Sequence, residues 1–176
     1  MRKSKMKKMK KILFAFLSLL AIGCAEQKPA EPTNGFGPYQ GQTVYFGNES
    51  SIDVFKAIDA AWASFDYSAM KNLIQDGGNF VFEDGYIATT GQEFVDKADA
   101  EYQESLEKGE DWGWNTDYAF SVYPKGSDDP KATNQEGEWV NAQFTGTDGT
   151  YIEWYHIVDG KLKNWYQTKG DYIMPK

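Results

Sequence analysis

The stretch YIEWYHIVDGKLKNWYQT, residues 151–168, decides the fold of this chain. Two runs of aromatic and β-branched residues flank Asp159-Gly160, a dipeptide typical of the two-residue turn between antiparallel strands. The stretch therefore predicts a β-hairpin. Counting outward from the turn gives the expected cross-strand pairs, which are Ile157 with Leu162, Tyr155 with Asn164, Trp154 with Trp165, Glu153 with Tyr166 and Tyr151 with Thr168.

The predicted pairing assigns each side chain of the hairpin to one face, because side chains alternate along a strand. One face carries three lysines and is expected to face solvent: Ile152, Trp154, His156, Lys161, Lys163, Trp165, Gln167 and Lys169. The opposite face is expected to line a pocket. The predicted ligand pocket consists of Trp62, Phe82, Tyr155, Asn164 and Tyr166, with a semi-buried Glu153 beside them.

The segments before the hairpin predict two more long strands and a group of helices. Alternation predicts strands over 115–123 and 138–145. Apolar residues at three- and four-residue spacing predict a helix after a capping box at Ser50 and Asp53. Further elements are a helix over 67–75 ended by Gly77-Gly78, short strands over 79–83 and 86–89, and a helix over 91–108 ended by Gly109. This order predicts an α+β domain, with a curved antiparallel β-sheet wrapped around about three N-terminal helices.

The N-terminal residues have the pattern of an export signal. A basic segment with Arg2 and six lysines precedes an apolar segment of twelve residues, 12–23. The apolar segment is shorter than the roughly 20 residues of a membrane-spanning helix. We therefore predict a signal peptide over 1–23, a flexible tether over 24–42 that is rich in Pro and Gly, and a folded domain over 43–176.

Cys24 is the only cysteine and follows the apolar segment directly. The sequence Leu20-Ala21-Ile22-Gly23-Cys24 resembles the bacterial lipobox, whose cysteine carries the lipid chains, palmitate included, that anchor a lipoprotein. The resemblance implies a chain held on the bilayer of the cell envelope, at the outer membrane if the host has one. The alternative is a secreted protein whose cysteine has no such role.

The charge of the predicted mature chain excludes several classes of function. Eleven lysines, with no arginine, oppose all twenty-six acidic residues after the leader, a net charge of −15. Because nucleic-acid binding needs cations to replace counterions, we expect no nucleic-acid partner. One histidine and one cysteine make a zinc site unexpected, and no phosphate-binding or dinucleotide motif is present, so no metal and no cofactor are predicted.

Four short motifs resemble the nuclear transport factor 2-like superfamily, in particular its SnoaL-like branch. They are AWASFDY at 61–67, FVFEDG at 80–85, GQEFV at 91–95 and YHIVDGKL at 155–162, and the resemblance spans about residues 51–172. It implies a cone-shaped α+β barrel with a pocket between sheet and helices, often dimeric through the sheet. Members include enzymes and non-catalytic binding domains, so the fold does not fix the function.

Asp84 is the first catalytic candidate, because an aspartate follows the first strand in the similar ketosteroid isomerases, in the place of Glu83-Asp84-Gly85 here. The oxyanion tyrosine of those enzymes corresponds to Ile58, which cannot donate a hydrogen bond. Glu153 as base and Tyr155 or Tyr166 as donor are further candidates. The alternative for Asp84 is a turn residue ahead of Gly85.

His156 lies on the predicted outer face and is assigned there to an interface with Trp154 and Trp165 rather than to catalysis. The aromatic pair in Trp112-Gly113-Trp114 is expected to rim the pocket. We predict a non-catalytic domain that binds a small apolar or glycan-like ligand. The alternatives are a cofactor-independent isomerase or lyase with a pocket carboxylate as base, and a protein-interaction or homodimerisation module.

Overall fold

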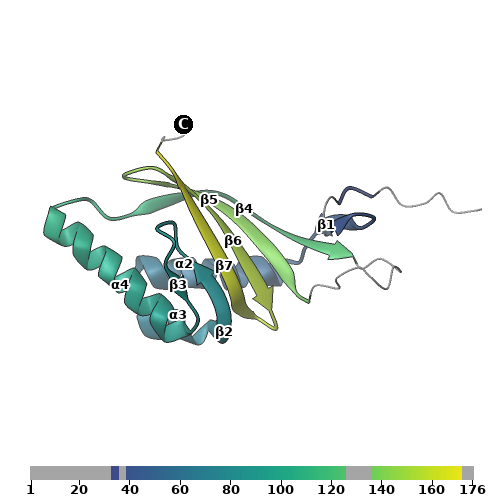
Figure 1. Cartoon of the computed structure of the whole chain (residues 1–176), viewed down its shortest axis with the longest axis horizontal. Helices are drawn as coiled ribbons and strands as arrows, with labels where there is room; N and C mark the ends of the chain where they lie inside the picture. Colours follow the sequence, from purple (N-terminus) through teal and green to yellow (C-terminus); the bar gives the residue numbers. More distant parts are fainter. Residues whose placement is uncertain (1–32, 36–38, 126–135, 172–176) are drawn as a thin grey trace, which may run out of the picture. The chain divides into compact units, whose positions relative to one another are not determined.

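One seven-stranded sheet and three helices make up the part of the chain that the computed structural model describes, which is residues 33–35, 39–125 and 136–171 (Figure 1). The predicted signal peptide, Cys24 and most of the predicted tether lie outside these residues. In chain order the elements are β1 (Thr43–Phe46), α2 (Glu49–Ala63), α3 (Tyr67–Asn72), β2 (Ile74–Val81), β3 (Ile87–Ala88), α4 (Gly91–Lys108), β4 (Trp114–Lys125), β5 (Glu138–Gly146), β6 (Thr150–Val158) and β7 (Lys161–Gly170). The predicted α+β class is confirmed.

The strands follow the order β1-β4-β5-β6-β7-β2-β3 across the sheet. Strands β4 to β7 form the predicted antiparallel meander. The prediction of a wholly antiparallel sheet is wrong at one place, because β2 runs parallel to β7. The chain between these two strands contains β3, α4 and the strands β4 to β6, and such a long connection permits parallel pairing.

The three helices cover one face of the sheet, which we call the inner face (Figure 1). Helix α2 packs against β4, β5 and β6, whereas α4 packs against β2 and β3, and α3 joins the two helices. The core between helices and sheet is aromatic, and its fully buried members include Trp165, Phe80 and Phe94. None of the described helices is long and apolar enough to cross a membrane.

Helix α4 has the bounds that its local sequence predicts. The Thr90 hydroxyl accepts a hydrogen bond from the backbone N–H of Glu93 at 3.1 Å, and the Glu93 carboxylate accepts one from the N–H of Thr90 at 3.2 Å. At the other end Gly109 has a φ of 69°, in the left-handed region that glycine adopts without strain. Both signals lie within the helix and its flanks, so a sequence reading can find them.

Helix α2 begins differently from the prediction. Its N-cap is Asn48, and the predicted capping box at Ser50 and Asp53 is wrong. The carboxylate of Glu138, on β5, accepts hydrogen bonds from the Asn48 backbone N–H at 2.8 Å and from the Ser51 hydroxyl at 2.7 Å. A distant acid therefore satisfies the start of this helix, which local spacing cannot indicate.

Strand β2 runs through the two glycines that were expected to end the second helix. Helix α3 ends at Asn72, and β2 begins at Ile74. A Cβ atom on Gly78 would lie 1.9 Å from the carbonyl oxygen of Lys163, so only glycine allows β2 to approach β7 this closely. The glycines mark a close contact between strands rather than the end of a helix.

A β-bulge in β7 changes the register that the hairpin turn predicts. The predicted pair Ile157 with Leu162 is confirmed, but His156 pairs with Asn164, so Lys163 is an extra residue in β7. Beyond this point the other predicted pairs are wrong by one residue, and Tyr155 pairs with Trp165. A shift of one residue turns every later side chain of β7 to the opposite face.

Candidate binding site

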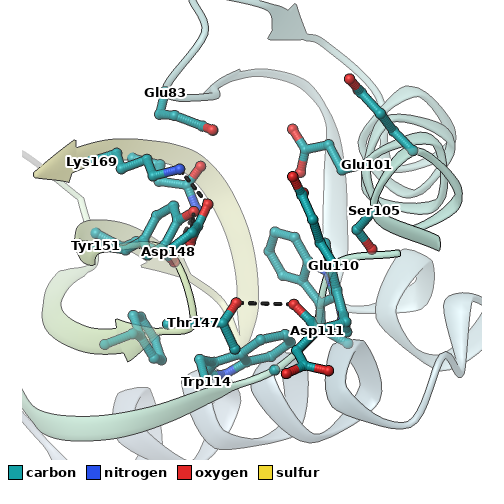
Figure 2. Close-up of a pocket in the computed structure, with 18 of the residues that line it drawn as sticks. Glu83, Glu101, Ser105, Glu110, Asp111, Trp114, Thr147, Asp148, Tyr151 and Lys169 are labelled. Atoms are coloured by element: carbon teal, nitrogen blue, oxygen red, sulfur yellow. Dashed lines mark hydrogen bonds and ion pairs between the residues drawn. The ribbon is translucent and has the colours of Figure 1, made fainter. Parts of the chain in front are cut away.

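A cavity of about 620 Å³ lies between the inner face of the sheet and α4. Its walls come from α2, α4, the loop over 110–113, and the ends of β4 to β7. Figure 2 shows Asp148, Tyr151 and Lys169 on one side of the space, with Glu101 and Ser105 of α4 on the other side. The volume lies within the range of about 300–1,000 Å³ found for small-molecule sites.

Glu153 of β6 is the most buried charged group of the cavity wall, with only 5% of the residue exposed. Its carboxylate accepts a hydrogen bond from the Tyr155 hydroxyl, one from the Trp165 indole N–H at 2.9 Å and one from the Gln167 amide at 2.8 Å. One donor from β6 itself and two from the neighbouring strand β7 therefore fix its position.

Burial raises the pKa of Glu153 to about 7, because the charged form loses its hydration. The three hydrogen bonds favour the ionised form and oppose this rise, and the nearby charge of Asp59 adds to it. Asp59, on α2, accepts a hydrogen bond from the Trp114 indole N–H at 2.8 Å. The cavity wall thus holds a carboxyl that titrates near neutral pH close to a second acid, Asp59.

Two lysines at the cavity are held in ion pairs. Lys97 of α4 lies 2.6 Å from Asp84 and 3.1 Å from Glu101. Hydrogen bonding with Lys97 is the main reason why the pKa of Asp84 is lowered. Burial raises the pKa of Glu101 to about 7 in spite of the same lysine. Lys169 pairs with Asp148, which also accepts a hydrogen bond from the Tyr151 hydroxyl at 2.9 Å.

Four of the predicted site residues line the cavity: Trp62, Asp84, Glu153 and Tyr155. Both indoles of Trp112-Gly113-Trp114 line it too, as predicted. Phe82 belongs instead to the core, where it is 1% exposed and does not line the cavity. Asp84 also caps the turn before Gly85, because its side chain accepts a hydrogen bond from the Tyr86 backbone N–H at 2.8 Å. Asp84 therefore stabilises the turn and also lies in the cavity wall.

The predictions for β7 are wrong, because they depended on the register counted from the turn, which takes no account of the bulge. Asn164 and Tyr166 pair with His156 and Trp154 and lie on the outer face, away from the cavity. Trp165, assigned to the outer interface, is fully buried in the core and packs 4.9 Å from Phe82, measured between ring centroids. Gln167 and Lys169 replace the two mispredicted residues in the cavity wall.

His156 lies on the outer face as predicted, but it is buried with 5% of the residue exposed. Its Nε2–H donates to the carbonyl oxygen of Glu136 at 2.6 Å, and its Nδ1 accepts from the Asn164 amide at 2.9 Å. The Trp139 ring stacks on the imidazole at 4.6 Å. Burial lowers the pKa of His156 and so favours the neutral ring, and these contacts are those of a structural residue.

The sequence reading missed several acids of the wall, notably Asp59, Glu101 and Asp148. A signal for Asp59 exists, since it lies four residues after Phe55 and three before Trp62 and so shares the apolar face of its helix. Glu101 and Asp148 have no such signal, because Glu101 lies on α4 and Asp148 lies in the β5–β6 turn, and only the fold brings them to one cavity. Within the described residues, no group of three His, Cys, Asp or Glu side chains is placed to hold a metal ion.

Comparison by sequence gives no family, since no protein-family model matches and no curated protein matches. Comparison by structure finds a SnoaL-like protein from Burkholderia thailandensis, 10% identical, with a TM-score of 0.52, covering 72% of this chain and 99% of that one. A domain with a cystatin-like fold from Nostoc punctiforme is 11% identical, with a TM-score of 0.50 and coverage of 69% and 76%. A second cystatin-like protein from Nostoc punctiforme is also 11% identical, with a TM-score of 0.50 and coverage of 71% and 92%.

At these identities the comparisons carry the fold alone. The mixed sheet covered on one face by three helices matches the arrangement that the sequence motifs imply. The described domain therefore has the fold of these SnoaL-like and cystatin-like structures, an α+β arrangement of the kind that the nuclear transport factor 2-like resemblance implies.

Proposed function

We propose that this chain is a membrane-anchored, extracytoplasmic domain that binds a small molecule in the cavity without catalysing a reaction on it. The observation that carries the proposal is Glu153, a carboxyl kept in the wall of a 620 Å³ cavity by three hydrogen-bond donors. A polar group that is fixed in the wall of a cavity of this size is the kind of feature that orients a bound small molecule.

The contacts of the predicted catalytic groups favour binding over catalysis. The Tyr155 hydroxyl donates to Glu153 and is therefore not free to donate to a ligand. Asp84 is paired with Lys97 and its pKa is lowered, so it is a weak base. Ile58 is fully buried in the apolar core, where it offers no donor for an oxyanion.

The membrane anchor is part of the proposal and depends on the N-terminal sequence. The basic and apolar segments of the leader are followed directly by Cys24, outside the described residues. Multiple acyl chains hold a protein on a bilayer stably, since each buried CH₂ contributes about 0.8 kcal/mol. Growth with an alkynyl fatty acid should label the chain, and the Cys24→Ser variant should stay unlabelled; equal labelling of both would contradict the anchor.

A thermal-shift screen tests the binding function. The panel contains neutral sugars, apolar aromatic compounds, amines and carboxylates. A compound at 100 times its Kd should raise the free energy of unfolding by about 2.7 kcal/mol, or several degrees in Tm. Trp112→Ala, in the cavity wall, should lose the shift, whereas Trp154→Ala, on the outer face and 37% exposed, should keep it. A complete absence of shifts, or equal loss in both variants, would count against the cavity.

A second candidate function is proton transfer by Glu153. The pKa of about 7 is the observation that favours it, because a general base works best when its pKa is near the working pH. A bound compound with an acidic C–H should then exchange that hydrogen for deuterium in D₂O. The exchange, followed by NMR, should be faster than in buffer with the wild type, and Glu153→Gln should return it to the buffer rate. If the wild type exchanges this hydrogen only at the buffer rate, proton transfer is excluded and ligand binding remains as the proposed function.

The predicted homodimer through the sheet stays a prediction. The outer face carries a groove of about 370 Å³ lined by Val122, Pro124, Trp139, Trp154 and Tyr166, among others. Trp154 is 37% exposed and Tyr166 is 41% exposed, so apolar surface is available there. Sedimentation of the wild type beside Trp154→Ala would show a dimer that the substitution weakens, or a monomer in both cases.

A further inference from the structure

We propose that the outer face of the sheet lies against the lipid bilayer, which it contacts through a row of apolar side chains that crosses six strands. The inference rests on the proposed function, since it needs a chain that is anchored at Cys24, and it adds which face of the domain meets the membrane. Three features support it, namely the row itself, its lack of charge, and the place where the N-terminal chain joins the sheet.

The row consists of side chains that lie opposite one another on successive strands of the outer face. In order across the sheet it contains Ile87 (β3), Val81 (β2), Tyr166 (β7), Trp154 (β6), Asn141 (β5) and Phe120 (β4). The exposed fractions are 53% for Ile87, 41% for Tyr166, 38% for Phe120 and 37% for Trp154. With about 4.8 Å between neighbouring strands, the row is about 24 Å long. An exposed apolar surface of this extent marks a site of interaction.

Two more aromatic side chains extend the row at its β1 end. Phe46 of β1 is 80% exposed, the highest fraction among the described large apolar residues. Its ring centroid lies 6.4 Å from that of Phe120, which stacks in turn on Tyr118 at 5.9 Å. We call the row together with Phe46 and Tyr118 the apolar strip. Burial of such side chains contributes roughly 25 cal/mol for each Å² that leaves water.

The apolar strip contains no charged side chain, although the chain carries 26 acidic residues. Nine carboxyl side chains line the cavity, which lies on the inner side of the sheet. Asp117, which precedes Tyr118 on β4, accepts hydrogen bonds from the Gln143 amide at 3.2 Å and from the Thr145 hydroxyl at 2.8 Å. Because a carboxylate is costly in a bilayer and is repelled by anionic headgroups, a surface without one is suited to membrane contact.

The N-terminal chain joins the sheet beside the apolar strip. The Asn34 side chain fastens the chain to β1, because its Oδ1 accepts from the Val44 backbone N–H at 2.7 Å and its Nδ2 donates to the Val44 carbonyl oxygen at 3.4 Å. Tyr39 and Val44 line the outer groove together with Trp154 and Tyr166 of the strip. The chain that leads back to Cys24 therefore leaves the domain next to the outer face.

The connection to the predicted anchor is short. Cys24 lies nine residues before Thr33, the first described residue. A fully extended chain spans at most about 3.5 Å per residue, so this connection reaches no more than about 30 Å. A lipid on Cys24 would thus keep the edge of β1 near the bilayer and make contact with the strip an intramolecular event. The indole of Trp154 and the phenol of Tyr166, each apolar with a polar tip, suit the level of the headgroups.

Quenching of tryptophan fluorescence by brominated lipid tests the contact. The full chain, purified from the membranes of the expressing cells, is reconstituted into vesicles of dioleoylphosphatidylcholine and into vesicles of the same lipid with brominated acyl chains. The bromine atoms should quench part of the wild-type emission, and Trp154→Phe should lose most of this quenching. Trp112→Phe, in the cavity wall, should be quenched like the wild type. High salt should leave the quenching unchanged, because the strip has no charge to screen.

Insertion of a charge into the strip gives a second test. Phe46→Glu should reduce the quenching severalfold, because the new carboxylate opposes entry into the bilayer. Leu106→Glu is the matched control, since it introduces the same charge at a 52% exposed apolar residue of α4, and it should leave the quenching unchanged. Both positions are exposed, so both variants should keep the circular dichroism spectrum of the wild type.

Flotation of the vesicles separates the inference from the anchor. A chain that floats with the vesicles but is quenched no more than Trp154→Phe overturns the inference and leaves the anchor intact. Equal loss of quenching in Phe46→Glu and Leu106→Glu also overturns it. A chain that does not float contradicts the anchor, and the inference fails with it. Absent quenching together with a dimer that Trp154→Ala weakens would assign the strip to a second copy of the chain instead.

Discussion

Replacing Trp165 with alanine is expected to lower the free energy of unfolding by about 3–5 kcal/mol, the usual cost of removing a large aromatic side chain from a core. The indole is fully buried, and its ring centroid lies 4.9 Å from that of Phe82 and 5.1 Å from that of Phe94. The substitution also removes the N–H that donates to Glu153 at 2.9 Å. A loss of this size approaches the whole stability of a typical domain.

Trp154→Ala is the matched control, since it removes the same side chain from the adjacent strand. Trp154 is 37% exposed on the outer face, so its loss should cost about 1 kcal/mol or less. Urea denaturation followed by circular dichroism measures both values. The register counted from the turn, without the bulge, places both tryptophans on the outer face. It predicts that both substitutions lower the free energy of unfolding by similar, small amounts. Equal losses in the two variants would therefore show that the bulge at Lys163 is misplaced.

Glu153→Gln is expected to remove a pH dependence of stability. The pKa of Glu153 is raised from 4.5 to about 7 in the folded chain, so the folded state binds more protons than the unfolded state between these values. Stability from this group is therefore present at low pH and is lost as the pH rises through 7. The wild type should lose about 2–3 kcal/mol of unfolding free energy from this carboxyl between pH 5 and pH 8.

Urea titrations of wild type and variant at several pH values test this expectation. Glu101 has a raised pKa of about 7 and acts in the same direction, whereas buried His156 has a lowered pKa and acts in the opposite direction. Both groups are present in each protein, so their contributions cancel in the difference. The stability of Glu153→Gln minus that of the wild type should rise between pH 5 and pH 8. A difference that stays constant over this range would mean that Glu153 ionises as an ordinary surface acid.

Local sequence signals predicted most of the helices and strands. The features that were predicted wrongly depend on contacts between segments that lie far apart in the sequence. Helix α4 was predicted with its bounds because Thr90, Glu93 and Gly109 act within the helix and its ends. The start of α2 was missed because its partner, Glu138, lies on β5. The bulge in β7 was missed because no turn or propensity rule indicates that Lys163 and Gly78 come together.

The candidate site was predicted in part for the same reason. Residues of β6 and of the loop before β4 were assigned correctly, since alternation from the turn holds along β6, which has no extra residue. Those of β7 beyond Leu162 were assigned to the wrong face. The acids Asp59 and Glu101 were not considered, because helical acids usually face solvent and only the packing of α4 places Glu101 in the wall.

The position of β7 inside the sheet has a consequence for how the chain folds during synthesis. Strand β7 is the last described strand, yet it lies between β6 and β2 and carries Trp165. Strand β2 is synthesised early, but the edge of β2 that pairs with β7 has no partner until residues 162–166 have been synthesised. Contacts this far apart in the sequence form late, after the loop between them has closed. A growing chain therefore remains without a finished core until β7 is complete.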